Sequence, residues 1–185
     1  MKKFYKNVGY GYICFAYSKN EWIAKAIAWF MRSQWSHSFI TIPPVIDNEM
    51  AMEAAGSGTQ TILFDKGYRN NKNQKYEIYQ VNYSKDKINK SIDSCLKKLE
   101  MPYGYLEYPW FIWRFICKSF GKDISGQNNW STKDEVCSGL VESFLSRLPC
   151  YNLFAKFGKN SICPQDIYEI VKANPHIFRL IEYKN

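Results

Sequence analysis

The sequence predicts an α+β protein in which a layer of helices packs on an antiparallel sheet. Before Ser84 the chain alternates short apolar runs with turn residues, as strands do, whereas after it apolar residues recur at helical spacing. This separation of strands from helices is typical of α+β folds. A length of 185 residues and an aromatic content of 17% suit one compact unit with a substantial core. We therefore expect residues 1–185 to form a single domain.

The expected elements follow from the spacing of the apolar residues. Strand-like runs occupy residues 10–18, 36–42, 50–56, 59–65 and 76–83, and a last run at 177–183 is expected to return to the sheet. Helical spacing occupies residues 20–32, 85–100, 104–120, 134–148 and 164–174. The polar segments are predicted to be exposed loops, and they span residues 66–76 and 121–134.

The charge and the cysteines narrow the function classes. A net charge of +8 suits nucleic acid, an anionic lipid surface or an acidic cell-wall polymer, but lysines spread along a chain more often form a solvated face, so the charge alone identifies no partner. The densest basic segment has the Gly and Asn content of a loop, so we expect no nucleic-acid partner. None of the six cysteines shows a C-x-x-C spacing, and we expect no metal site. In the absence of a recognisable export signal, the thiols are expected to be reduced.

Two stretches are strongly apolar, residues 22–31 and 108–117. Each is far shorter than the roughly 20 residues that a membrane-spanning helix needs, and each contains a charged residue. We expect both to form helices that are buried in the core. The alternative is a helix at a lipid interface, which an aromatic segment on a basic protein also suits.

The helix expected at residues 134–148 has a cysteine close to its start. Apolar residues recur there every four positions and indicate a helix packed on the sheet. Thr132 or Asp134 is a candidate N-cap, which puts Cys137 in the first turn or just beyond it. Unpaired amides and the positive end of the helix dipole stabilise a thiolate at that place, and Gly139 leaves its approach uncrowded. A buried structural cysteine fits the pattern equally well.

A nucleophilic cysteine needs a base and an orienting group, and two strand residues can supply them. Alternation in "WSHSFITI" puts Trp35, His37 and Phe39 on one face, and in "MAMEAAG" Glu53 stands among alanines. If the two strands are neighbours, Glu53 can bind one imidazole nitrogen while the other faces Cys137. A structural histidine and an ordinary edge-strand carboxylate remain open on pattern alone.

Several motifs resemble the NlpC/P60 superfamily of papain-like cysteine hydrolases. "VCSGLV", with "MPYGY" upstream, is similar to the start of the nucleophile helix and the P-Y segment of that superfamily. "WSHSFI" and "MEAAG" precede the cysteine, as in the circularly permuted branch that includes YiiX-like and lecithin:retinol acyltransferase-like proteins, and "CPQDIYE" resembles the late P-x-D-L helix of that branch. The chain departs from the branch in having "GYICF" where G-D-I is frequent, and in a longer segment before "VCSGLV".

The resemblance implies a papain-like fold and a set of site residues. Cys137 would be the nucleophile, His37 its base and Glu53 the orienting group, with no metal or organic cofactor. Substrate contacts would come from Trp35, Tyr103, Tyr105 and Ser138. His176 is the rival base because it follows the cysteine, but only nine residues remain after it, too few for the further strands of an unpermuted domain.

These features predict a thiol hydrolase, an amidase or peptidase, that cleaves an amide or ester through an acyl-enzyme. The resemblance implies cell-wall peptides, other peptide-like amides or lipid acyl chains as substrates, and a bacterial or phage origin. The alternatives are a lipid acyltransferase or thioesterase of the same superfamily and an inactive binding module of a phage or cell-surface assembly. We expect a chain that is cytoplasmic as synthesised, with peripheral membrane contact left open and no indication of its oligomeric state.

Overall fold

The fold is built around one antiparallel sheet. A computed structural model describes residues 9–105, 107–124, 135–157 and 161–185. Within these residues six strands are arranged in the order β4-β3-β2-β1-β5-β6. The strands are β1 (Tyr12–Ser18), β2 (His37–Val45), β3 (Asn48–Ala55), β4 (Gly58–Leu63), β5 (Gln74–Val81) and β6 (Phe178–Lys184). The α+β class and the antiparallel sheet predicted from the sequence are thereby confirmed.

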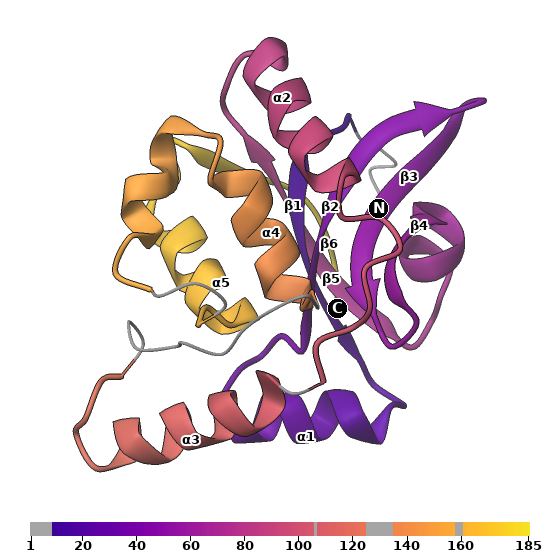
Figure 1. The fold of residues 1–185 in the computed structure, drawn as a ribbon. Helices are drawn as coiled ribbons and strands as arrows, with labels where there is room; N and C mark the ends of the chain where they lie inside the picture. The colour runs from indigo at the N-terminus through magenta and orange to yellow at the C-terminus, as the bar shows by residue number, and fades with distance from the viewer. Residues whose placement is uncertain (1–8, 106, 125–134, 158–160) are drawn as a thin grey trace.

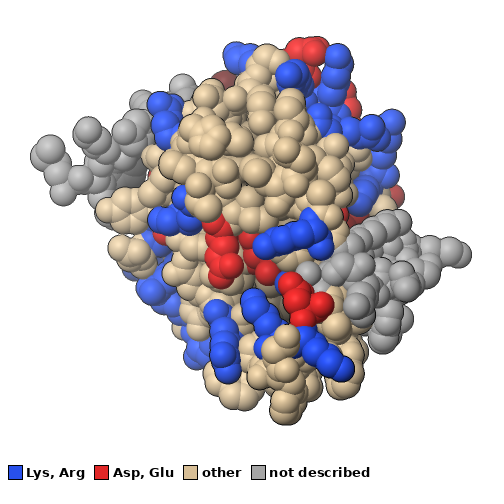
Figure 2. All heavy atoms as spheres, turned by 90° about the vertical axis from the view of Figure 1, so that its left-hand side faces the viewer, with Lys and Arg blue, Asp and Glu red and all other residues tan. Residues whose placement is uncertain are grey.

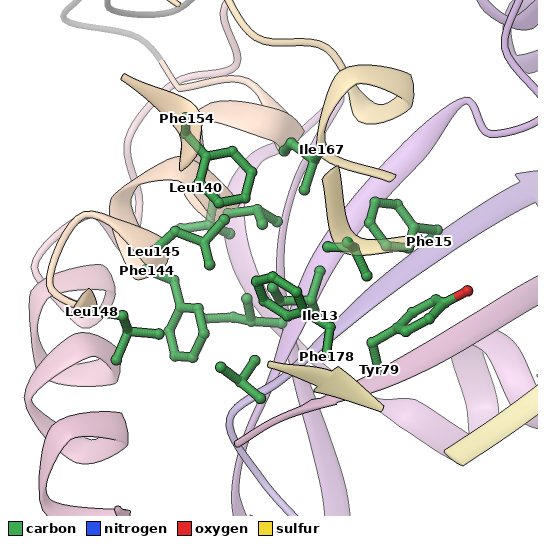
Figure 3. Packing of buried hydrophobic residues seen from close by; sticks show 14 of the residues in the cluster. Ile13, Phe15, Tyr79, Leu140, Phe144, Leu145, Leu148, Phe154, Ile167 and Phe178 are labelled. Carbon is green, nitrogen blue, oxygen red and sulfur yellow. The ribbon is translucent and has the colours of Figure 1, made fainter. Parts of the chain in front are cut away.

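Helices cover one face of this sheet and enclose the larger core. They are α2 (Lys85–Leu96), α4 (Cys137–Leu145), the 3₁₀ helix η2 (Pro149–Phe154) and α5 (Pro164–Ala173). The apolar stripe of α4 includes Leu140 and Phe144, which pack with Ile13 and Phe15 of the central strand β1 (Figure 3). Because α4 lies against β2 and β3, its first turn is held beside the ends of those strands.

The opposite face of the sheet is covered by a short segment that the sequence did not predict. Residues 66–76 were expected to form an exposed loop, but a one-turn π-helix, η1 (Asp65–Arg69), occupies the start of that range and β5 begins before its end. Tyr68 is buried there, with its ring stacked on Phe39 at a centroid distance of 4.1 Å. The prediction was wrong because one aromatic side chain, surrounded by polar neighbours, finds an apolar surface on the sheet.

Two helices lie at one end of the molecule, below the sheet and α4 in Figure 1. They are α1 (Trp22–Phe30) and α3 (Glu107–Ser119). Both were expected to be buried, but each buries only one side and exposes large apolar side chains on the other, including Trp29 and Trp113. The expectation was wrong because no described part of the chain packs over their outer faces. No helix of the described residues is long and apolar enough to cross a membrane.

The helix that carries the cysteine begins at Cys137 itself. Val136 is the N-cap, with extended backbone and no side-chain hydrogen bond to the first turn. The candidate caps Thr132 and Asp134 lie outside the described residues, as does most of the polar segment at 121–134. Because α4 begins at Cys137, its first turn offers backbone amides beside the thiol, as the sequence predicted.

Candidate active site

Two neighbouring strands bring a histidine and a glutamate together. In the pairing of β2 with β3, Thr41 lies opposite Ala51, so Glu53 shares a sheet face with Ala51 near the start of β2. His37 is the first residue of β2, and its Nε2 lies 3.0 Å from Oε2 of Glu53. The glutamate is buried and the imidazole is partly exposed. One ring nitrogen of the histidine is thus held by a carboxylate, and Nδ1 is left for another partner.

That partner is the thiol of Cys137. The sulfur and the His37 ring are joined by a side-chain hydrogen bond, and the backbone amides of Ser38 and Ser138 also donate to the sulfur. The amide of Ser138 belongs to the first turn of α4, where N–H groups have no partner within the helix. Three contacts that favour a thiolate therefore converge on the sulfur of Cys137, a residue that is only 7% exposed.

The pKa values of the three groups are shifted in the directions of an ion pair. Burial alone would lower the pKa of His37, but its hydrogen bonds to Cys137 and Glu53 raise it to about 10. Burial alone would raise the pKa of Cys137, yet the bond to His37 and the two amides lower it. Burial also opposes ionisation of Glu53, and the partners of its carboxylate, His37 first, lower its pKa to about 2. At neutral pH the arrangement favours thiolate, imidazolium and carboxylate in a row.

Two further side chains hold the carboxylate, and the sequence did not single out either one. Gln60 lies opposite Glu53 in the β3–β4 hairpin and donates from Nε2 to Oε1 at 3.0 Å. The hydroxyl of Tyr68 donates to Oε2, the oxygen that His37 also contacts. The hairpin turn of "AAGSGT" could have placed Gln60 opposite Glu53. Nothing in the local pattern points to Tyr68, because it reaches the site from the π-helical turn.

The position of Tyr68 depends on the last strand. Lys184 of β6 donates from Nζ to the backbone carbonyls of Tyr68, Arg69 and Asn71, at 3.3, 2.9 and 2.5 Å. Arg69 adds a pair of hydrogen bonds to Glu182 at 3.2 Å each. Strand β6 thus holds η1 in place and, through Tyr68, helps to orient the Glu53 carboxylate.

A buried ion pair supports the start of α4 from its other side. Glu135 is almost fully buried and pairs with Lys98, which follows α2. Its backbone joins the segment before α3, accepting from Gly104 at 3.0 Å and donating to Pro102 at 2.9 Å. A methyl group on Gly139 would lie 2.3 Å from Oε1 of Glu135, so a larger residue there would force the Glu135 carboxylate to move. Sequence reasoning assigned Gly139 to access and missed its contact with Glu135.

The residues predicted to contact the substrate are placed differently from one another. Ser138 is the residue after Cys137 in the chain. Tyr103 forms a β-bridge with Glu135, and Glu135 is two residues before Cys137. Tyr105 packs edge-on against Tyr103 at 5.0 Å, and its hydroxyl donates to the carbonyl of Gly56. These tyrosines lie beside the start of α4, and their contact with a substrate stays a prediction.

The structure also places the residues that were expected to share a sheet face with His37, and the rival base His176. Trp35 does not share a face with His37 and Phe39, because β2 begins only at His37 and Trp35 packs in the main core against Phe15. His37 and Phe39 do stack on one side, with centroids 5.8 Å apart. The rival base His176 lies in an exposed turn between α5 and β6, next to Asn82.

Comparisons with known proteins show the fold and no more. Neither models of protein families nor curated protein sequences match the chain. The chain is similar in structure to the metalloprotein YiiX from Escherichia coli O157:H7, with a TM-score of 0.55 and 16% sequence identity over 95% of this chain and 97% of that one. At this identity the likeness establishes a YiiX-like fold.

The word metalloprotein applies to YiiX, and the described residues of this chain do not fit a bound metal ion. Among them, no three His, Cys, Asp or Glu side chains are grouped as a metal site requires. Both nitrogens of the most suitable histidine, His37, are already used by Glu53 and Cys137.

Proposed function

We propose that this protein is a thiol hydrolase, an amidase or peptidase of the permuted NlpC/P60 type, that cleaves an amide or ester through a Cys137 acyl-enzyme. The observation that carries the proposal is the continuous chain of contacts from the Cys137 sulfur through His37 to Glu53. A thiolate at a helix start, an imidazole against it and a carboxylate behind the imidazole are the parts that nucleophilic catalysis requires.

In the acylation step, the Cys137 thiolate attacks the carbonyl carbon of the substrate and forms the C–S bond. The negative charge moves to the carbonyl oxygen, where unpaired amides at the start of α4 can stabilise it. The His37 imidazolium then gives its proton to the leaving amine or alcohol as the bond to that group breaks. Glu53 holds the ring in place and stabilises its positive charge throughout.

In the deacylation step, neutral His37 takes a proton from a water molecule, and the resulting hydroxide attacks the thioester. The acid leaves, and the thiolate and imidazolium are restored. Tyr103 and Tyr105 lie beside the start of α4, where they would contact the substrate. A peptide-like amide suits this site, and the basic surface suits an acidic or anionic carrier of that amide.

A second candidate, acyl transfer from a lipid, is favoured by one observation. The helices α1 and α3 expose large aromatic side chains at one end of the molecule. A lipid acyl chain bound there would be passed to Cys137 by the same thiolate chemistry, with an alcohol or amine as the acceptor in place of water. Retained transfer from phospholipid together with no turnover of soluble amides would select this candidate.

The test is the rate at which iodoacetamide alkylates Cys137 between about pH 4 and about pH 10, mapped by mass spectrometry. The wild type is compared with His37→Ala and with His176→Ala as a matched control, since the chain has two histidines. Burial raises the pKa of Cys14, Cys95 and Cys163, so these thiols are expected to react slowly.

Alkylation of Cys137 well below the pH at which a free thiol reacts, removed by His37→Ala and kept in His176→Ala, would support the proposal. Screening of amide and ester substrates would then follow, with Cys137→Ala as the blank. A Cys137 that titrates like a free thiol, or that is inert in all three proteins, would overturn the catalytic assignment in favour of a binding module.

A further inference from the structure

The helix α1 carries large apolar side chains that are directed away from the protein. Trp22 and Trp29 are 77% and 74% exposed, and Lys25 between them is exposed as well. Spacings of three and seven residues put these three side chains on one helical face. Phe30 packs edge-on against Trp29 with centroids 4.9 Å apart. Ala24 is buried, so α1 rests on the protein by a small-residue side and presents its aromatic side outward.

The helix α3 has the same division into two sides. Trp113 is 56% exposed, Ile116 is also exposed, and Phe120, just after the helix, is 82% exposed. These residues are again spaced by three and seven positions and so share a face. Trp110 and Phe111 are buried on another side of the helix. Folding therefore buries the apolar residues on the inner side of α3, and it does not account for the apolar residues on the outer side.

The two helices meet at one end of the molecule. Met31, which follows α1, packs against the cluster of Trp110 and Phe111, and Arg32 lies over the ring of Phe115 at 5.0 Å. Figure 1 shows α1 and α3 below the sheet, on the side away from α2. The α1–α3 surface is defined here by Trp22, Lys25, Trp29, Phe30, Trp113, Ile116 and Phe120.

One basic residue stands on the aromatic face of α1, and further basic residues follow both helices. Lys25 lies between Trp22 and Trp29, whereas Lys118 of α3 is on the side toward α5, near Asp166 and Glu169. Arg32 and Lys122 extend the positive charge beyond the helices, while acidic Glu21 and Asp123 stand at the ends. Figure 2, which views the molecule from the side, shows Lys and Arg side chains and uncharged surface toward the lower end, with Asp and Glu side chains next to and just above them.

We infer that the α1–α3 surface docks onto an anionic lipid bilayer. Exposed tryptophan and phenylalanine side chains beside lysines are the composition of helices that lie in a membrane interface, where the rings enter the headgroup region and the lysines meet anionic lipids. The helices lie on the bilayer, because 9 and 13 residues are too few to cross it. A second copy of the chain fits less well, since a two-fold contact would bring basic residues against basic residues.

Docking in this way would also orient the candidate active site. The first turn of α4, which carries Cys137, is at the end of that helix closer to α1 and α3 (Figure 1). A docked molecule would present this end toward the bilayer, within reach of amides or esters anchored there. The docking inference itself does not depend on the chemistry of Cys137.

The experiment is co-sedimentation of the full chain with vesicles of phosphatidylcholine alone or with phosphatidylglycerol added. Two test variants are Trp29→Ala/Trp113→Ala and Lys25→Glu. The matched controls are Ile46→Ala, an exposed apolar residue in the β2–β3 turn, and Lys85→Glu in α2, at the other end of the molecule. Light scattering without vesicles reports the oligomeric state of each protein.

We expect binding to the anionic vesicles that falls by about tenfold or more in both test variants and by much less in both controls. A blue shift of the tryptophan emission that is lost in the first variant would support the same conclusion. No binding to anionic vesicles, equal losses in the controls, or an oligomer that dissociates only in the test variants would overturn the inference.

Discussion

Tyr68 and His37 contact the same oxygen of Glu53, Oε2, and their rings lie nearly parallel, with an angle of 12° between the planes and centroids 6.5 Å apart. One of these residues is on strand β2 and the other is on the π-helical turn η1. The carboxylate that orients the histidine is therefore itself oriented by a residue from the opposite covering layer. The contact between Tyr68 and Glu53 arises only in the tertiary structure, and it can be tested by removing the Tyr68 hydroxyl.

Tyr68→Phe removes the hydroxyl that donates to Glu53 and keeps the ring that stacks on Phe39. Since a hydrogen bond to a charged group contributes roughly 1.5–3 kcal/mol, the pKa of Glu53 should rise from about 2 by about one unit or more. The pKa can be followed by carbon NMR of the side-chain carboxyl. An unchanged Glu53 pKa would contradict the contact, and Tyr76→Phe, whose hydroxyl binds Glu182 instead, serves as the control.

Glu53→Gln should change how stability depends on pH. The folded pKa of Glu53 is lowered from 4.5 to about 2, so its carboxylate stabilises the fold above about pH 4.5, and this stabilisation is lost as the pH falls toward 2. The wild type should therefore lose about 3 kcal/mol of unfolding free energy over that range that the variant does not lose. Urea unfolding at a series of pH values measures the difference. Parallel curves for the two proteins would contradict the lowered pKa.

Gly139→Ala should destabilise the protein even though alanine usually favours a helix. The added methyl group would come within 2.3 Å of Oε1 of Glu135, which is buried and paired with Lys98. Because the Glu135 carboxylate is held by burial and by Lys98, it cannot move away freely, and we expect the crowding to cost up to about 3 kcal/mol against the roughly 1 kcal/mol gained from helix propensity. Urea unfolding measures it, with Ser143→Ala on the same helix as a control expected to change little. A Gly139→Ala protein as stable as the wild type would rule out this close approach.

Lys184→Met should disturb the site from a distance. Its ammonium group holds three carbonyls at the end of η1, and without it the turn that carries Tyr68 is less restrained. We expect faster hydrogen exchange of the amides of residues 66–70 and alkylation of Cys137 that begins at higher pH than in the wild type. Lys85→Met, an exposed lysine on α2, is the control. Slower or unchanged exchange in η1 would show that Lys184 does not position it.

The elements and the candidate triad were largely predictable because both depend on local patterns. A two-residue period identified the strands, and the same alternation put Glu53 on the face of Ala51, where the structure has it. The position of Cys137 at a helix start followed from the spacing of the apolar residues after it. Alternation failed at Trp35 because it holds only within a strand, and β2 begins two residues later.

What the sequence by itself determined is the class of the fold, the order of its elements and which three residues could form a nucleophile, a base and an orienting group. Only the tertiary structure decided that Tyr68 and Gln60 hold Glu53, that Glu135 closes against Gly139, and that α1 and α3 leave aromatic faces uncovered by the described residues. The reason is physical: periodicity reports which side chains share a face of their own element. Contacts between distant segments, and the burial of an apolar face, depend on what the rest of the chain packs against it.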